Sequence, residues 1–181
     1  MTHKTLRTML LSALFAALTA VGAFIRMPIG PTSITLQFFF SALAGILLGV
    51  KWGVLSQVLY VGLGLLGFPI FTMGGGISYL FQPSFGFLLG LIPSTAVIGA
   101  LTYRHTARPR LFLGCLLGDL VLYLFGVPYM YMILHLYTGS DTTWLAMWAS
   151  MLVYVPGDLI KLAVLTAAGP VLQRRLSRYD Q

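Results

Sequence analysis

The sequence predicts an all-α membrane protein, a bundle of six transmembrane helices with both chain ends in the cytoplasm. Hydrophobic residues make up 58% of the 181 residues, and charged residues only 8%. Soluble globular domains carry about 25% charged residues, so this composition excludes a soluble domain. Apolar stretches of about 20 residues, the length of a membrane-crossing helix, recur along the chain, and the basic residues fall between them.

Turn-forming or polar residues separate six apolar stretches within one integral membrane domain of residues 1–181. We expect the spans at residues 6–27, 36–50, 52–68, 83–103, 111–137 and 144–172. A proline- and glycine-containing loop follows the first span, a very tight turn at Lys51 joins the second and third, and a glycine-rich loop covers residues 69–82. The first apolar stretch is long for a signal peptide, so we expect it to be retained as a helix.

The distribution of positive charge sets the expected orientation. Nine of the 11 Lys and Arg residues lie on the side predicted to be cytoplasmic: Lys4, Arg7, Lys51, Arg104, Arg108, Arg110, Arg174, Arg175 and Arg178. Only Arg26 lies on the outer side, and Lys161 lies within a span. Cytoplasmic loops of membrane proteins are enriched in Lys and Arg. Membrane topology therefore explains the net charge of +7, and we expect no nucleic acid as a partner.

Two spans are longer than a single straight helix needs. Residues 144–172 would extend about 43 Å as one helix, whereas the hydrocarbon core is about 30 Å thick. Proline is tolerated in the first turn of a helix and disrupts its interior. We therefore predict a break near Val155 and a new helix from Pro156. A weaker form of the same argument predicts a break at Gly126 and Pro128.

Asp158 and Lys161 are the first candidates for ligand binding. They lie three residues apart, on one face of the predicted helix, and ionisable groups at membrane depth are costly and usually functional. A carboxylate accepts hydrogen bonds from ligand N–H groups, and an ammonium pairs with a ligand carboxylate. The alternative is a structural role, in which the negative charge of Asp158 stabilises the helix N-terminus and Lys161 neutralises that charge. We favour ligand binding, because buried ion pairs stabilise proteins weakly.

The second candidate is the outer loop that contains Gly74, Gly75, Gly76 and Tyr79. Glycines allow close approach of the backbone to a ligand. The alternative is a flexible turn with Tyr79 in the interfacial aromatic belt. Gln37, at the outer end of the second span, either faces a cavity or is an interfacial polar residue.

The remaining polar residues suggest no catalytic chemistry. Asp119 lies within a span and needs a partner or water, while Arg26 either attracts an anionic ligand or marks the outer boundary. The lone Cys115 has no disulfide partner in the chain. No residues have metal-ligand spacing, and no nucleophile lies near a base. We therefore expect no catalytic residues, no metal, no cofactor and no enzymatic activity.

The first span carries small residues four positions apart, a spacing that lets membrane helices pack closely. The pairs are Ala13 with Ala17 and Ala16 with Ala20. They predict a helix contact, either within the bundle or with another subunit.

Several short motifs are spread along the chain. They are Thr35-Leu36-Gln37, Leu48-Gly49, Gly53, Leu55-Ser56-Gln57, Leu59-Tyr60, Gly67-Phe68-Pro69-Ile70-Phe71, Gly74-Gly75-Gly76, Pro83, and Pro156-Gly157-Asp158 with Lys161. In combination they resemble the BioY family, the substrate-binding S components of energy-coupling-factor (ECF) biotin transporters. The resemblance covers nearly the whole chain.

This resemblance implies a six-helix S-component fold in a prokaryotic cell membrane, with biotin as the transported substrate bound near the outer face. It places Asp158 at the ureido head of biotin, Lys161 at the valerate carboxylate, and the glycine loop with Tyr79 over the bicyclic ring. The small-residue face of the first span would dock on a transmembrane coupling subunit that carries two ATPase subunits. Transport by toppling of the S component in the membrane is the mechanism that it implies.

Two other functions stay open from the residues themselves. The chain could be an S component for another small carboxylate-bearing vitamin, or a non-transporting membrane subunit with a role in assembly. The first predicts a different ligand and the second predicts none.

Overall fold

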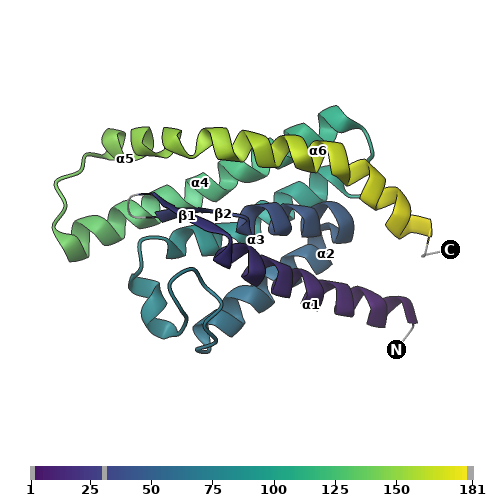
Figure 1. The fold of residues 1–181 in the computed structure, drawn as a ribbon, viewed down its shortest axis with the longest axis horizontal. Helices are drawn as coiled ribbons and strands as arrows, with labels where there is room; N and C mark the ends of the chain where they lie inside the picture. Colours follow the sequence, from purple (N-terminus) through teal and green to yellow (C-terminus); the bar gives the residue numbers. More distant parts are fainter. Residues whose placement is uncertain (1–2, 30–31, 179–181) are drawn as a thin grey trace.

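The computed structural model describes residues 3–29 and 32–178, and helices make up most of this part of the chain (Figure 1). Within these residues, five helices are long and apolar enough to cross a membrane. They are α1 (His3–Phe24), α2 (Gln37–Leu65), α3 (Phe85–Thr102), α4 (Arg108–Thr138) and α6 (Val155–Arg178). The other elements are shorter: strands β1 (Arg26–Ile29) and β2 (Thr32–Thr35), the 3₁₀ turns η1 (Ile77–Phe81) and η2 (Met151–Val153), and helix α5 (Trp144–Ser150).

Helix α2 consists of two arms joined at Gly49, which has φ 74° and ψ −170°. The arms fold back on one another, since a Cβ atom on Gly53 would lie 3.1 Å from the carbonyl oxygen of Ala44. Positive φ favours glycine, so the turn falls at Gly49 rather than at Lys51. The two arms correspond to the second and third predicted spans, and with them the six expected helices fit the structure.

The segment after α1 differs from the all-α expectation. Helix α1 ends at Phe24, and β1 and β2 then form an antiparallel pair in which Arg26 faces Thr35. The sequence analysis predicted helix to residue 27 and a loop after it. The β-branched residues Thr32, Ile34 and Thr35 favour a strand, and Pro28, which lacks an N–H, is tolerated in an edge strand.

Helix α4 runs without a break from Arg108 to Thr138, so the predicted interruption at Gly126 and Pro128 is wrong. In a membrane bundle, neighbouring groups can compensate for the hydrogen bond that a proline removes. Gly126 has a packing role instead: a Cβ atom there would lie 2.3 Å from the ring of Phe87.

The predicted break in the last span is confirmed. Helix α5 ends at Ser150, η2 follows, and α6 begins at Val155 with Pro156 in its first turn. Because proline suits the first turn of a helix, this local sequence starts the helix that carries Asp158.

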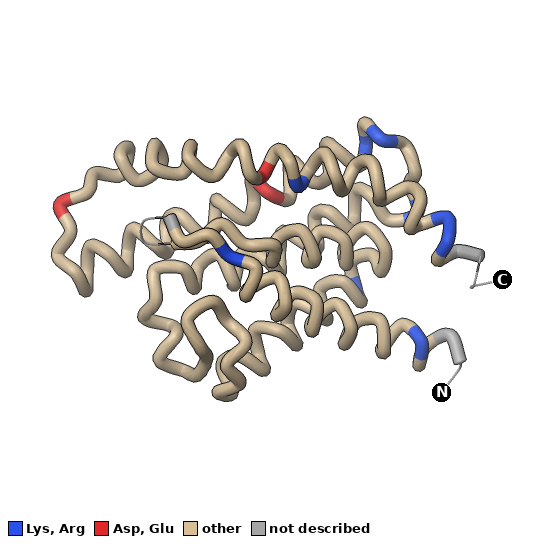
Figure 2. Tube along the Cα trace, in the orientation of Figure 1, with Lys and Arg blue, Asp and Glu red and all other residues tan. Residues whose placement is uncertain are grey.

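The two chain ends lie at the same end of the molecule (Figure 1). Most Lys and Arg residues gather at that end, as Figure 2 shows. Helix α3 packs against both α2 and α4, α1 packs against α2, and α6 packs against α2 and α4. We call the half of the bundle with the chain ends the basic end. The β-hairpin and the loop between α2 and α3 lie away from it.

Candidate functional site

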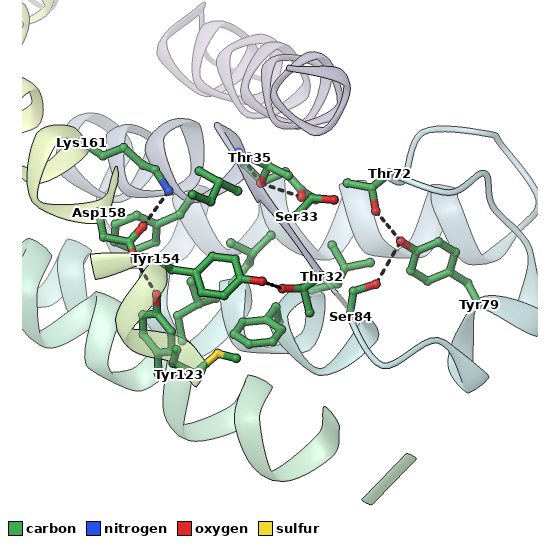
Figure 3. A pocket seen from close by; sticks show the side chains of 18 residues that line it. Thr32, Ser33, Thr35, Thr72, Tyr79, Ser84, Tyr123, Tyr154, Asp158 and Lys161 are labelled. Carbon is green, nitrogen blue, oxygen red and sulfur yellow. Dashed lines mark hydrogen bonds and ion pairs between the residues drawn. The ribbon is translucent and has the colours of Figure 1, made fainter. Parts of the chain in front are cut away.

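A cavity of about 80 Å³ lies between strand β2, the loop from α2 to α3, and helices α3, α4 and α6 (Figure 3). Its walls are mainly apolar, with Phe87, Leu88 and Leu91 from α3 and Leu122 from α4. Polar side chains concentrate at two ends. An apolar chamber with a few placed polar groups is typical of a small-molecule site.

One end of the cavity, here called the ionic end, is an ion pair on the first turns of α6. The Lys161 Nζ lies 2.7 Å from Asp158 Oδ1, and the two side chains are 10% and 11% exposed. Tyr123 on α4 donates a hydrogen bond of 2.5 Å to Asp158 Oδ2. The predicted pair is thus present and buried against the cavity. An ammonium has three N–H donors, so Lys161 keeps two of them beyond its bond to Asp158.

Gln37 also lines the cavity and is 7% exposed. Of its two predicted environments, this is the cavity-facing one. Its Nε2 donates to the hydroxyl of Tyr60 at 2.7 Å, and its Oε1 accepts from Thr35 Oγ1 at 2.9 Å. Tyr60 in turn donates to the carbonyl of Ile70. These bonds fix the Gln37 amide between the start of α2 and the following loop.

At the other end of the cavity, three hydroxyl groups form a chain that we call the hydroxyl end (Figure 3). Tyr79 Oη lies 2.7 Å from Thr72 Oγ1 and 3.3 Å from Ser84 Oγ. Tyr79 is 3% exposed and packs on the ring of Phe71. The alternative that placed Tyr79 in an interfacial belt therefore does not fit.

The three neighbouring glycines do not line this cavity, and their contact with a ligand stays a prediction. Gly74 and Gly76 have φ values of 112° and 98°, and a Cβ atom on Gly75 would lie 2.0 Å from the Phe68 carbonyl oxygen. Glycine is needed at these positions so that the loop can fold tightly. The glycines thus position Thr72 and Tyr79 at the cavity.

Two contacts hold the β-hairpin over the cavity. Thr32 Oγ1 donates to the Tyr154 hydroxyl at 2.6 Å, across the middle of the chamber (Figure 3). Arg26 Nη1 donates to the carbonyl of Thr72. The hairpin is therefore tied to the start of α6 on one side and to the hydroxyl end on the other.

Comparison with known proteins identifies the family. The model of the BioY family matches residues 1–178. The chain belongs to the BioY family. The probable biotin transporter BioY of Lysinibacillus sphaericus is 41% identical over 139 residues, which cover 76% of this chain and 71% of that protein. The biotin transporter BioY of Thermotoga maritima is 34% identical over 160 residues, which cover 88% and 91% of the two chains.

Solved structures agree with this assignment. A crystal structure of the S component for biotin from an ECF-type ABC transporter has a TM-score of 0.76 and 28% identity, and the match covers 96% of this chain and 95% of that chain. FolT bound with folic acid shares the fold, with a TM-score of 0.56 and 20% identity over 98% and 95% of the chains. The predicted resemblance to BioY is confirmed. This chain is a multi-pass membrane protein of a transporter family and not an enzyme.

The four alanines of this BioY chain separate into two groups. Ala16 and Ala20 are buried against the core, whereas Ala13 and Ala17 are exposed. Positions three apart on a helix are rotated by about 60°, so the two pairs face different directions. The buried pair packs within the bundle, which is one of the two predicted kinds of contact, and docking of the small-residue face on a partner stays a prediction.

Asp119 is 8% exposed and does not line the cavity. Its Oδ1 accepts no hydrogen bond from the described part of the chain. Asp158 and Lys161 both act on it electrostatically. Within the same described ranges, no three His, Cys, Asp or Glu side chains are grouped as metal ligands.

Several residues that line the cavity are not predicted from the sequence, namely Tyr123, Tyr154, Thr32 and Ser84. Thr72 also lines it and lies within the predicted outer loop. They are single hydroxyl residues in apolar or loop segments, and only the packing of distant elements brings them together. Ser84 had one usable signal, because it follows the proline that ends the outer loop.

Proposed function

We propose that this BioY chain is the biotin-binding S component of an ECF-type transporter. It captures biotin at the outer face of the cell membrane and delivers it to the cytoplasm. A transmembrane coupling subunit and two ATPase subunits act with it. Biotin is the transported substrate, and the proposal includes no cofactor. The single domain of residues 1–181 is the membrane-embedded binding unit.

The observation that carries this proposal is the pairing of a carboxylate and an ammonium at the ionic end of an apolar chamber. Asp158 Oδ1 and Lys161 Nζ lie 2.7 Å apart, with both side chains about nine-tenths buried. The ureido head of biotin presents N–H donors next to a carbonyl acceptor. An acceptor and a donor held side by side match this head group, and charge-assisted hydrogen bonds are among the stronger ones.

This geometry changes one assignment that the resemblance implied. Biotin has its ureido group and its valerate carboxylate at opposite ends, and one ion pair cannot reach both ends of an extended ligand. We therefore assign the ureido head to Asp158 and Lys161 together. The carboxylate then lies toward the hydroxyl end, where Tyr79, Thr72 and Ser84 supply O–H donors. Arg26, bonded to the Thr72 carbonyl, adds positive charge near that end.

The charge distribution supports the proposed orientation. The basic end of the bundle holds both chain ends, the turn between the arms of α2 and the loop between α3 and α4 (Figure 2). By the positive-inside rule this end faces the cytoplasm. The hairpin and the loop that closes the cavity then face outward, so biotin enters from outside.

Ala13 and Ala17 remain the proposed docking residues on α1 for the coupling subunit. They are exposed on the outward face of the helix, beside the exposed Leu10 and Leu14. Small residues let a partner helix approach closely.

The test is equilibrium binding of radiolabelled biotin to the purified chain in detergent, with no ATPase subunits present. We expect one biotin per chain. Competition with an excess of unlabelled folate, thiamine, lipoate or pantothenate should leave the bound label unchanged. Displacement by one of these compounds would assign the site to that vitamin, and no binding by folded protein would favour the assembly role.

A further inference from the structure

A second cavity, of about 350 Å³, lies at the basic end of the bundle, beside the last turns of the helix whose first turns carry the ionic pair. The first arm of α2 contributes Ile46 and Leu47, the loop after α3 contributes Tyr103 and Arg104, and the last turns of α6 contribute Arg174 and others. The cavity thus has apolar walls formed by Ile46, Leu47, Tyr103 and Leu176, and a polar part formed by Thr106, Gln173 and the two arginines. None of the acidic residues in the described part of the chain lines it.

Arg104 has an unusual backbone conformation. Its φ of 60° is the only positive value for a non-glycine residue within the described ranges. It follows the C-terminus of α3, the position where glycine in the left-handed region is the usual residue. A side chain there carries a steric cost that glycine avoids. Arginine at this position indicates that its side chain has a use, since outliers of this kind concentrate at functional sites.

The neighbouring ring helps to fix the arginine side chain. The Arg104 guanidinium carbon lies 5.2 Å from the centre of the Tyr103 ring, within the range of a cation–π contact. The Tyr103 ring also packs over Gly49, where a Cβ atom would lie 3.0 Å from it. The turn between the two arms of α2 therefore supports the ring, and the ring supports the guanidinium.

We propose that this cavity binds the headgroup of an anionic glycerophospholipid, with its phosphate on Arg104 and Arg174 and its glycerol and upper acyl carbons against Ile46, Leu47 and Leu176. A guanidinium presents a planar fork of donors that fits phosphate oxygens. Basic pockets between membrane helices on the cytoplasmic side favour anionic headgroups. The apolar walls favour a lipid over free phosphate. The proposal depends on the membrane location and not on the ligand of the first cavity.

The test is the affinity of the purified chain for phosphatidylglycerol and phosphatidylcholine in dodecyl maltoside, measured by native mass spectrometry and by the thermal unfolding temperature. We expect phosphatidylglycerol to bind and to raise the unfolding temperature, and phosphatidylcholine to do neither at the same mole fraction. Arg104→Gly should weaken phosphatidylglycerol binding by about 10- to 150-fold, the range for a lost hydrogen bond to a charged group. It should not lower the unfolding temperature in the absence of lipid, because glycine relieves the left-handed conformation.

Two further variants sharpen the test. Arg174→Gln should also weaken phosphatidylglycerol binding. Arg108→Gln removes one positive charge from the same end of the bundle without removing a side chain that lines the cavity, and should leave the affinity within about twofold of wild type. An equal loss of phosphatidylglycerol affinity in the Arg108 variant would show that only the overall positive charge of this end matters, and would overturn the proposal. Equal binding of phosphatidylcholine, no change in Arg104→Gly, or the same thermal shift with inorganic phosphate would also overturn it.

Discussion

The two ends of the first cavity are built in different ways. The ionic end comes from one turn of α6, where Asp158 and Lys161 lie three residues apart, with one added bond from Tyr123 on α4. The hydroxyl end comes from the loop between α2 and α3 and the start of α3, and Arg26 ties it to the β-hairpin. A helical turn holds two groups at a fixed spacing, whereas a loop does so only when its own packing is complete.

This difference suggests separate roles in the capture of biotin. Loops are the more mobile parts of a fold, and binding elements that move come from its less stable regions. The hydroxyl end and the hairpin are therefore suited to open and close, while the ionic end stays in place. The ionic end should therefore make the largest contribution to the affinity for biotin. The hydroxyl end should contact the valerate carboxylate and set the rate at which biotin dissociates.

The largest effect is expected at the ionic end. Lys161→Ala leaves the Asp158 carboxylate buried without its counter-charge, and breaking a buried pair costs about 3–5 kcal/mol of stability. Biotin affinity should fall by about 10- to 150-fold, because a charge-assisted bond to the ligand is lost. Asp158→Asn should weaken biotin binding over the same range. Chemical denaturation and equilibrium binding of labelled biotin measure the two quantities.

A double variant separates stability from binding in this experiment. Asp158→Leu combined with Lys161→Met replaces both charges with apolar groups of similar size, which is often neutral or stabilising for a buried pair. We expect it to unfold near the wild-type denaturant midpoint and to bind no biotin. Wild-type affinity in the double variant would show that the pair is structural only.

A smaller effect is expected at the hydroxyl end. Tyr79→Phe removes the central hydroxyl of the hydroxyl end, while the hydroxyls of Thr72 and Ser84 remain to donate to the carboxylate. We therefore expect only a partial loss, of about 2- to 13-fold in affinity, which corresponds to about 0.5–1.5 kcal/mol. Biotin amide, which lacks the carboxylate, should bind the variant and the wild type alike. Asp158→Asn, in contrast, should weaken both ligands. A Tyr79 variant that weakens both ligands equally would contradict our placement of the carboxylate.

The ionic end, which comes from one helical turn, is easier to predict from sequence than the hydroxyl end, which comes from a packed loop. Asp158 and Lys161 were found because their rarity in an apolar span and their spacing are both local properties. The break before α6 was likewise predicted from Pro156 alone. The six spans are predicted from apolar length, and the split within α2 is predicted from the short connection at Lys51, two residues from the observed bend at Gly49.

The features that were missed depend on contacts between distant segments. Tyr123 and Thr32 reach the cavity only because α4 and the β-hairpin pack around it. The β-hairpin stands where a loop is predicted, because the backbone groups of its two strands hydrogen-bond to each other. A strand of only four residues gives too weak a sequence pattern to be recognised. Pro128 was read as a break, but the surrounding bundle keeps α4 helical. The role of the outer-loop glycines in shaping the loop that carries Tyr79 likewise depends on the backbone conformation and packing of the folded loop.

The hydrogen bond between the β-hairpin and the outer loop can be tested through the rate of biotin dissociation. Arg26→Ala removes the bond to the Thr72 carbonyl, and exposed charged contacts contribute at most about 1 kcal/mol. We expect biotin to dissociate about two- to fivefold faster, as measured by chase of labelled biotin with an excess of unlabelled biotin. Arg7→Ala, which removes a positive charge at the basic end of α1, is the matched control and should dissociate at the wild-type rate. An unchanged rate in the Arg26 variant would show that the hairpin does not control release.

The smallest effect is expected for Asp119, the other acid that faces this region. It is as buried as Asp158, but it does not line the cavity, and its Oδ1 has no hydrogen bond within the described ranges. Asp119→Asn keeps the shape of the side chain and removes only the ionisable group, so the affinity for biotin should stay within about twofold of wild type. The unfolding temperature should not fall, because burial of a neutral amide costs less free energy than burial of a carboxylate without a hydrogen-bond donor. Equilibrium binding next to Asp158→Asn gives the comparison directly. A loss as large as that of the Asp158 variant would mean that the ionic end is a three-residue cluster, and that affinity depends on α4 as much as on the single turn of α6.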